Sequence, residues 1–289
     1  MGFLTIIIVG LMTCYLIYKA MPFFFKEGIG SMLLETDWKP LDENPKYGIV
    51  YMVATTLFGS LGAMVLAMPI GIFTAIYLVK IAPSWVTNIL EPIIAILAGI
   101  PSIIYGMFGL IVITPVLYQV EKKYFLLERD FILLTKERDA ILSSGGANLI
   151  ASILVLAIMI LPTIITMSQT VLKAVPEKVE HGALALGATS LQMIFTVTLK
   201  SASSGLFAIG MLGIGRVIGE TMAISFVSGG NVAFPSPFSS VRFLTTALVS
   251  EMGYAQGTHR EALFAIGLIL YLFEMILIMF VEQVMKYKQ

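Results

Sequence analysis

Long runs of apolar residues alternate with shorter polar segments along the chain. Six of these runs reach the roughly 20 residues that an α-helix needs to cross about 30 Å of hydrocarbon. The pattern predicts an all-α polytopic membrane protein with six transmembrane helices, organised as a single transmembrane domain over residues 1–289. The predicted spans are about 2–25, 49–80, 88–118, 148–172, 202–228 and 262–284.

The second and third runs are longer than a straight span requires, and both contain helix-breaking residues. Pro69 and Gly71 interrupt the second run, and Gly99, Pro101 and Pro115 interrupt the third. We therefore expect tilt or a kink in these two spans. The first run lacks a basic leading region and a small-residue cleavage site, so we interpret it as a retained helix.

Composition supports the membrane interpretation and excludes several other classes. The chain is 58% hydrophobic and 12% charged, with a mean hydropathy of +0.93, whereas soluble domains are about a quarter charged. Its formal net charge is zero, so the sequence lacks the excess of basic residues that is typical of nucleic-acid-binding proteins. Cys14 is the single cysteine, and His181 and His259 are the only histidines. These counts exclude an intrachain disulfide and a Cys/His zinc site, and we expect no cofactor.

Positive charge does not by itself orient the chain. With a cytoplasmic N-terminus, six lysines fall on the cytoplasmic side and ten basic residues on the outer side, the reverse of the positive-inside rule. Half of the outer ten belong to a charged insertion at 119–147, in which acids and bases are mixed.

Two ionisable residues lie inside the fifth predicted span, where charge is costly. Arg216 and Glu220 are four residues apart, so on one helix they would project from the same face. A planar guanidinium suits an oxyanion, which favours a functional role. The alternative is a structural ion pair that neutralises itself within the bundle. Glu274 is isolated in the last span, and we assign it a packing role.

Glycines crowd the same predicted span, in the spacing Gly213-x-Gly215-x-x-x-Gly219. This spacing misses the dinucleotide-binding fingerprint and follows no predicted strand. Gly215 and Gly219 instead favour close packing of membrane helices, with the alternative that exposed backbone here lines a pathway. The chain contains no G-x-S-x-G, HExxH or P-loop motif, so we expect no catalytic residues and no enzymatic activity of its own.

The segment 173–201 connects two predicted spans and is amphipathic. Pro176 is placed to start a helix, and Gly187 breaks the helical pattern midway. A helix, a glycine-centred turn and a second helix could dock a partner at the membrane surface. An interfacial connector without a partner is the alternative.

This segment resembles the EAA loop of ABC importer permeases, which docks an ATPase. Gly187-Ala188-Thr189 and Gln192 match the loop pattern. His181 occupies the position of the family's glutamate, with Glu180 one residue earlier, and Lys200 replaces the family's proline.

Other segments resemble phosphate-specific permeases among these importers. Gly99-Ile100-Pro101-Ser102, with Tyr105-Gly106 and Phe108-Gly109-Leu110 after it, is similar to their third span. Residues 213–223 are similar to their fifth span. Trp38-x-Pro40, Tyr47-Gly48-Ile49 and Thr221-Met222-Ala223 point to the C-type of the two permease subunits.

The resemblance implies a type I ABC importer permease, multi-pass in the plasma membrane of a prokaryote, with 173–201 on the cytoplasmic side. It implies as partners a second homologous permease, a cytoplasmic ATPase dimer, an extracytoplasmic phosphate-binding protein, and phosphate. The implied pathway residues are Arg216, Glu220 and Thr221, and the implied docking residues are Glu180, His181, Gly187, Ala188 and Gln192.

Two alternatives stay open at this point. One is a permease for another oxyanion, such as sulfate, molybdate or phosphonate, which arginine chemistry alone does not distinguish from phosphate. The other is a stand-alone channel or secondary transporter. The lack of detectable inverted repeats and the glycine-centred loop count against that class.

Overall fold

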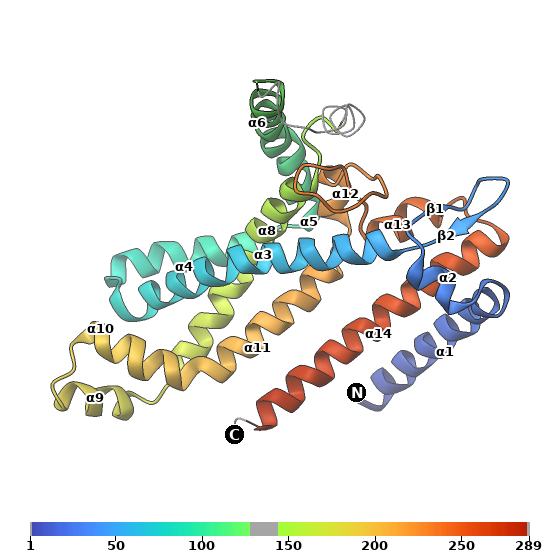
Figure 1. The fold of residues 1–289 in the computed structure, drawn as a ribbon. Helices are drawn as coiled ribbons and strands as arrows, with labels where there is room; N and C mark the ends of the chain where they lie inside the picture. Colours follow the sequence, from blue (N-terminus) through green and yellow to red (C-terminus); the bar gives the residue numbers. More distant parts are fainter. Residues whose placement is uncertain (1, 128–143, 288–289) are drawn as a thin grey trace. The chain divides into compact units, whose positions relative to one another are not determined.

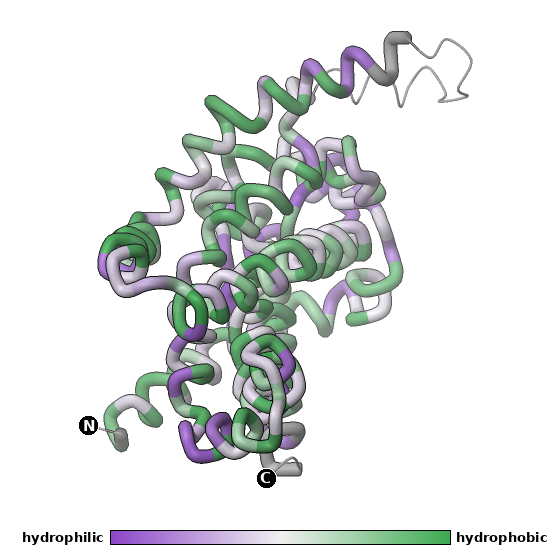
Figure 2. Tube along the Cα trace, turned by 90° about the vertical axis from the view of Figure 1, so that its left-hand side faces the viewer, coloured by the Kyte–Doolittle hydropathy of each residue, from purple (hydrophilic) through white to green (hydrophobic). Residues whose placement is uncertain are grey.

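The structure is a computed structural model that describes residues 2–127 and 144–287 (Figure 1). Most of the predicted charged insertion at 119–147 therefore lies outside the described residues. Within the described part, six helices are long and apolar enough to cross a membrane, which confirms the predicted fold class. Apolar residues predominate along the helices in Figure 2. The six helices are Phe3–Glu27, Val50–Ile81, Ser102–Lys123, Leu149–Lys173, Ser190–Ile218 and Gly257–Phe280.

The part of the chain that the structure describes is helical apart from one short hairpin and its connecting loops. The elements of the first half are α1 (Gly2–Glu27), α2 (Ile29–Leu34), β1 (Trp38–Lys39), β2 (Lys46–Tyr47), α3 (Val50–Ile76), the π-helical turn η1 (Tyr77–Ile81), α4 (Ser84–Ala98), α5 (Ser102–Phe108), the π-helical turn η2 (Gly109–Ile113) and α6 (Thr114–Leu127). Those of the second half are α8 (Leu149–Lys173), α9 (Glu177–Ala185), α10 (Ser190–Gln192), the π-helical turn η3 (Met193–Thr198), α11 (Leu199–Ile218), α12 (Met222–Val227), α13 (Leu244–Glu251) and α14 (Gly257–Tyr287).

The third predicted run, 88–118, differs from the structure because the chain breaks within it. Helix α4 ends at Ala98, and α5 begins at Ser102, so the spanning helix starts after Pro101. Proline lacks an N–H and disfavours helical backbone in the residue before it, which explains the position of the break. The Tyr105 hydroxyl donates a hydrogen bond to the Leu97 carbonyl across it, at 2.8 Å.

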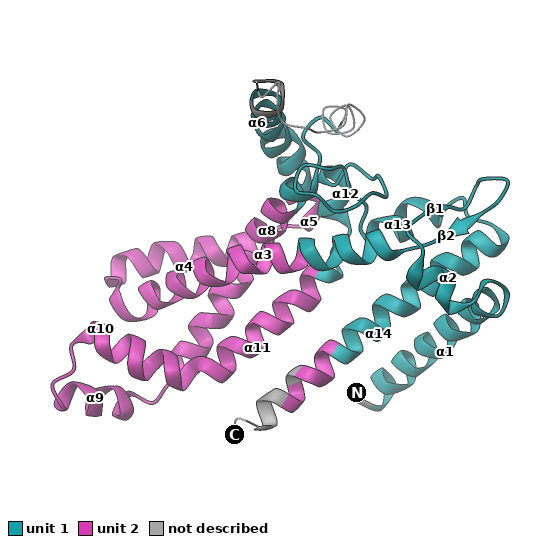
Figure 3. Ribbon diagram, viewed as in Figure 1, with its two compact units in different colours: residues 1–59, 106–152, 218–276 teal, residues 60–105, 153–217, 277–289 magenta. Residues whose placement is uncertain are grey.

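Contacts divide the chain into two compact units, coloured teal and magenta in Figure 3. The single-domain organisation stays a prediction. The first unit comprises residues 1–59, 106–152 and 218–276. Phe23, Met32, Ile49, Phe243 and Leu263 are fully buried in its core.

The second unit comprises residues 60–105, 153–217 and 277–289, with α8 as its most buried span. Glycines bring the neighbouring helices close to α8. A Cβ added at Gly71 of α3 would lie 2.6 Å from Ile164, and one at Gly205 of α11 would lie 2.6 Å from Val171. Membrane helices associate through such close packing because burial from lipid supplies no hydrophobic gain.

Candidate transport and docking sites

Arg216 and Glu220 do not share a helix face, contrary to the expectation from their spacing. Arg216 lies in the last turn of α11, which ends at Ile218, and Glu220 lies in the link before α12. Gly219 at the break has a low helix propensity. The Glu220 carboxylate also accepts a hydrogen bond from the Ala223 amide, at 3.1 Å, which favours a new helix start over continuation of α11.

Arg216 is exposed, and its position is set by α8 of the same unit. Its Nη1 donates a hydrogen bond to the Thr163 hydroxyl, at 3.3 Å. A guanidinium has five N–H donors, so this bond occupies a small part of its capacity. The arrangement holds the side chain at one end while leaving donors and charge for an oxyanion.

Glu220 and Thr221 form the start of α12 in the other unit. The Glu220 carbonyl accepts a hydrogen bond from the Thr245 hydroxyl of α13, at 2.9 Å, which fixes the backbone of the link. The Thr221 carbonyl accepts from the Ser225 amide, at 3.0 Å, and Thr221 precedes the first helical residue. Both residues are half-buried. The carboxylate is thus oriented by backbone contacts on either side of it.

The glycine-centred turn predicted in 173–201 is present, and it ends α9. Gly187 has a φ of 90°, which only glycine adopts readily. Its amide donates to the Leu184 carbonyl at 3.0 Å, and the Ala188 amide donates to Ala183 at 3.2 Å. This pair of bonds is the Schellman ending, which satisfies the last carbonyls of the helix.

The second helix of the loop begins with a reciprocal cap. The turn before it and the start of this helix expose apolar side chains. The Thr189 amide donates to Gln192 Oε1 at 2.9 Å, and the Gln192 amide donates to the Thr189 hydroxyl at 3.3 Å. Leu186 at the turn is 92% exposed, and Leu191 and Phe195 are also exposed. An apolar surface of this kind next to a membrane favours a partner.

Glu180 differs from the other proposed docking residues because it faces the interior of its unit. It is buried, and its carboxylate pairs with Lys80 Nζ at 2.7 Å. The Thr198 hydroxyl donates to the same carboxylate, also at 2.7 Å. His181, Gly187 and Gln192 are exposed, so the structure separates them from Glu180. A side chain held in this way anchors the loop and does not present its charge to a partner.

The anchor joins three elements of the second unit, since Glu180 lies on α9, Lys80 on η1 and Thr198 on η3. Burial raises the pKa of the Glu180 carboxyl, but the hydrogen bonds from Lys80 and Thr198, together with the charge of Lys80, outweigh it and hold that pKa below its ordinary value. The carboxyl is therefore charged throughout the neutral range.

Breaking this anchor on one side is expected to cost more than removing it altogether. Lys80→Met alone strands a buried carboxylate and is expected to lower the free energy of unfolding by roughly 3 kcal/mol, whereas Lys80→Met/Glu180→Met loses less. Thermal unfolding of the purified protein in detergent measures both. Because the pKa of Glu180 is lowered, the pair stabilises fully above the ordinary value of about 4.3 and loses this effect as pH falls below it. A loss in Lys80→Met/Glu180→Met that equals or exceeds the loss in Lys80→Met would contradict the assignment.

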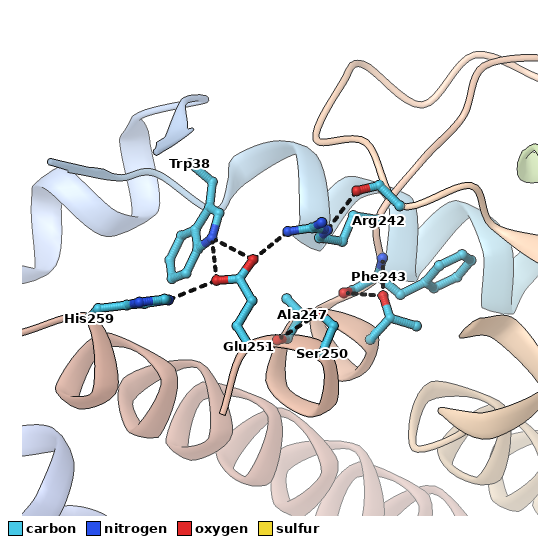
Figure 4. A network of polar contacts seen from close by, with 9 residues as sticks. Trp38, Arg242, Phe243, Ala247, Ser250, Glu251 and His259 are labelled. Atoms are coloured by element: carbon cyan, nitrogen blue, oxygen red, sulfur yellow. Dashed lines mark hydrogen bonds and ion pairs between the residues drawn. The ribbon is translucent and has the colours of Figure 1, made fainter. Parts of the chain in front are cut away.

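A second buried cluster lies in the first unit and surrounds Glu251 at the end of α13 (Figure 4). Its carboxylate accepts hydrogen bonds from Trp38 Nε1, at 3.0 Å, from His259 Nε2, at 2.8 Å, and from the Arg242 guanidinium. Arg242 Nε donates further to the Gly230 carbonyl, at 2.7 Å. The cluster therefore ties the β1–β2 hairpin, the 229–243 loop and the start of α14 to one carboxylate.

Sequence reasoning did not find this cluster. Trp38 lies in β1, Arg242 in the loop before α13, Glu251 at the end of α13 and His259 in α14, and no sequence motif connects these four positions. The one sign of the cluster in the sequence is that these residues lie in segments whose other residues favour turns. Buried charge is retained only when paired and hydrogen-bonded, so the cluster is expected to hold these segments in a single arrangement.

The sequence profile of one protein family, described as the binding-protein-dependent transport system inner membrane component, matches residues 67–286. The chain belongs to this family. Permeases of this family are transport components of importers, and the six apolar helices agree with a multi-pass inner membrane protein.

Relatives within the family align over most of the chain. It is 38% identical over 246 residues to the "Phosphate transport system permease protein PstC" of Haemophilus influenzae, covering 84% of this chain and 76% of that protein. It is 31% identical over 275 residues to the "Probable ABC transporter permease protein YqgH" of Bacillus subtilis, covering 93% and 82%. The resemblance to phosphate permeases stated from the sequence is thereby confirmed.

Solved structures support the same fold. An inward-facing structure of the MetNI methionine ABC transporter matches with a TM-score of 0.57 and 17% identity, covering 84% of this chain and 94% of that chain. At this identity the likeness concerns the fold alone, and it confirms the type I ABC importer permease fold.

Proposed function

We propose that the chain is a permease subunit of an ATP-driven importer of inorganic phosphate. It forms half of the translocation pathway with a second homologous permease, and it docks a cytoplasmic ATPase. An extracytoplasmic binding protein delivers the phosphate. The observation that carries the proposal is the 38% identity, over 84% of the chain, to a relative named as a phosphate transport permease.

The pathway chemistry rests on Arg216 and on Glu220. Phosphate enters with one to two negative charges, so a pathway must offset its dehydration without trapping it. Arg216 is exposed and keeps N–H donors beyond its bond to Thr163, which supports a role in contacting the anion. Glu220, with a carboxylate held by the Ala223 amide, opposes anion charge and keeps binding weak enough for release.

The docking role rests on the 177–195 segment. Its turn exposes Leu186, and Leu191 and Phe195 extend the apolar surface. The Glu180–Lys80–Thr198 anchor connects α9 to η1, which continues α3, and to η3, which leads into α11. Movement of an ATPase against the loop is thereby transmitted to spans: closure of the ATPases turns the pathway outward, and hydrolysis returns it inward.

The deciding experiment is transport and ATPase activity of the reconstituted complex with its binding protein. Phosphate is expected to stimulate both ATP hydrolysis and uptake, and omission of the binding protein is the control. Stimulation by sulfate, molybdate or phosphonate, and not by phosphate, would identify a permease for a different oxyanion. Uptake that needs no ATP would instead place the chain among channels or secondary transporters.

Assembly with the second permease gives a further prediction at Gly215. A Cβ added there would lie 4.0 Å from Leu277, an ordinary separation, whereas one at Gly213 would lie 2.7 Å from Met64. Gly215→Leu is therefore expected to leave the chain folded and to lower copurification of the second permease, because small residues allow close helix packing. Gly219 lies beyond the end of α11, so it does not extend this helix face, and its packing role stays a prediction.

Gly213→Leu is the matched control, and it is expected to destabilise the chain itself. Copurification is measured by affinity capture of one subunit, and folding by thermal unfolding. Normal recovery of the second permease with Gly215→Leu would remove the packing role from Gly215.

A further inference from the structure

A cavity of about 390 Å³ lies between α1 and the first part of α14, both in the first unit. The two helices run side by side in Figure 1, and they contact each other through Tyr15 and Phe264, with ring centroids 6.0 Å apart. Thr13 and Tyr271 share a hydrogen bond of 2.8 Å further along. The cavity has no part in the pathway or the docking loop described above.

The polar wall of the cavity carries an excess of positive charge. Lys19 of α1 and Arg260 of α14 both line it. Neither belongs to an ion pair within residues 2–127 and 144–287. Glu261 also lines the cavity, but its carboxylate is paired with Lys26 at 3.1 Å. Two cations therefore face a cavity whose carboxylate is already neutralised.

The position of Lys19 makes an anionic occupant favourable. It is half-buried, eight residues before the end of the span Phe3–Glu27, which corresponds to about 12 Å along the helix. Its Nζ lies 5.6 Å from the Tyr18 ring and 5.9 Å from the Tyr15 ring. A cation at this depth is costly in hydrocarbon unless its charge is compensated. The two tyrosine rings orient the ammonium group of Lys19, and a bound anion would neutralise its positive charge.

The surroundings of the cavity distinguish a lipid from a free ion. Tyr18 is 72% exposed, and Met21 and Phe25 on the same helix are also exposed. Apolar and aromatic side chains beside a cationic cavity suit a molecule with an anionic head and acyl chains. A free phosphate would gain nothing from them. The cavity volume is within the range of ligand sites and can hold a headgroup.

We propose that this cavity binds the headgroup of an anionic glycerophospholipid, with Lys19 and Arg260 contacting its phosphate. The acyl chains lie along the exposed apolar surface of α1. Tyr15 and Tyr18, which line the same cavity, contact the glycerol region. The proposal is independent of the transported substrate.

Lipid binding to the purified protein, kept with the subunits that copurify, tests this site. Native mass spectrometry compares phosphatidylglycerol with phosphatidylcholine of the same acyl chains. Lys19→Gln/Arg260→Gln is expected to lower phosphatidylglycerol affinity about tenfold or more, because each cation contributes substantially at an anionic surface. Lys39→Gln/Lys122→Gln removes two cations outside the cavity and is the matched control, with no change expected.

A photoactivatable phosphatidylglycerol on the wild-type protein keeps the test decisive if the double variant does not assemble. Its crosslinks are expected in peptides that contain 15–22 and 257–264. Equal affinity for phosphatidylcholine, an unchanged affinity in the double variant, or crosslinks elsewhere would overturn the proposal. Displacement of the lipid by inorganic phosphate alone would also overturn it and assign the cavity to a free ion.

Discussion

Arg216→Gln is expected to abolish phosphate uptake while the complex still assembles and its ATPase remains active. Glutamine stays polar but ends two bonds short of the Nη1 position, so the positive charge, the bidentate donor geometry and the hydrogen bond to the Thr163 hydroxyl are all lost. If Arg216 stabilises the anion during passage, its loss raises the barrier to transport and leaves the docking loop unaffected. Uptake of labelled phosphate into proteoliposomes, with ATP hydrolysis in the same vesicles, measures both.

Two variants separate this role from a structural one. Thr163→Val removes only the hydrogen bond that holds Arg216, and it is expected to reduce uptake partially. Glu220→Gln keeps an acceptor for the Ala223 amide and removes the charge, so it is expected to slow release of the anion and lower turnover.

The structural-pair alternative makes a different forecast for the same residues. A pair that stabilises the fold would be restored by the swap Arg216→Glu/Glu220→Arg, with recovery of assembly and uptake. Because α11 ends before Glu220, we expect no such recovery. An assembled Arg216→Gln complex that transports at the wild-type rate would end the pathway hypothesis.

Gly187→Val is expected to uncouple ATP hydrolysis from uptake, with a loss of transport of about tenfold or more. The backbone at Gly187 has a φ of 90°, and a β-branched residue there is strained by roughly 1–3 kcal/mol. The strain opens the Schellman ending of α9 and changes the angle of the loop that we propose docks the ATPase. The ratio of phosphate transported to ATP hydrolysed is the measurement.

Gly182→Val is the matched control within the same loop. A Cβ meets nothing within 4 Å at either glycine, so space does not distinguish them. Gly182 lies inside α9 and has no positive φ, so valine is tolerated there. Coupling that falls equally in both variants would show that the conformation at Gly187 is not the cause.

The sequence predicted the spans and the glycine turn because each depends on a local property. A span requires a continuous apolar run, since every backbone polar group in lipid must be satisfied within its own helix. Gly187 breaks the helical pattern wherever the loop is placed, because its effect lies in its own backbone. Pro101 likewise indicated a break, although the sequence suggested a kink and the structure has two separate helices there.

The helix end at Ile218 shows where local spacing was insufficient. Arg216 and Glu220 at four residues apart suggest one helix face, but that inference assumes a continuous helix. The Thr245 hydroxyl, from a helix 25 residues later, holds the Glu220 carbonyl, and the carboxylate caps α12. The hydrogen-bond donor that fixes the backbone of this link, Thr245, comes from elsewhere in the chain. It could not be identified from residues 213–223 alone.

The sequence by itself therefore determined the membrane class, the six apolar spans, the family resemblance and the glycine-centred loop, because each is carried by contiguous residues. Only the tertiary structure decided that Glu180 is an anchor, since its partner Lys80 is 100 residues away. It also decided that Trp38, Arg242 and His259 converge on Glu251. The physical reason is the same for both: a buried carboxylate must be compensated, and part of the compensation comes from a residue far along the chain, Lys80 for Glu180 and Trp38 for Glu251, that meets it only when the chain folds.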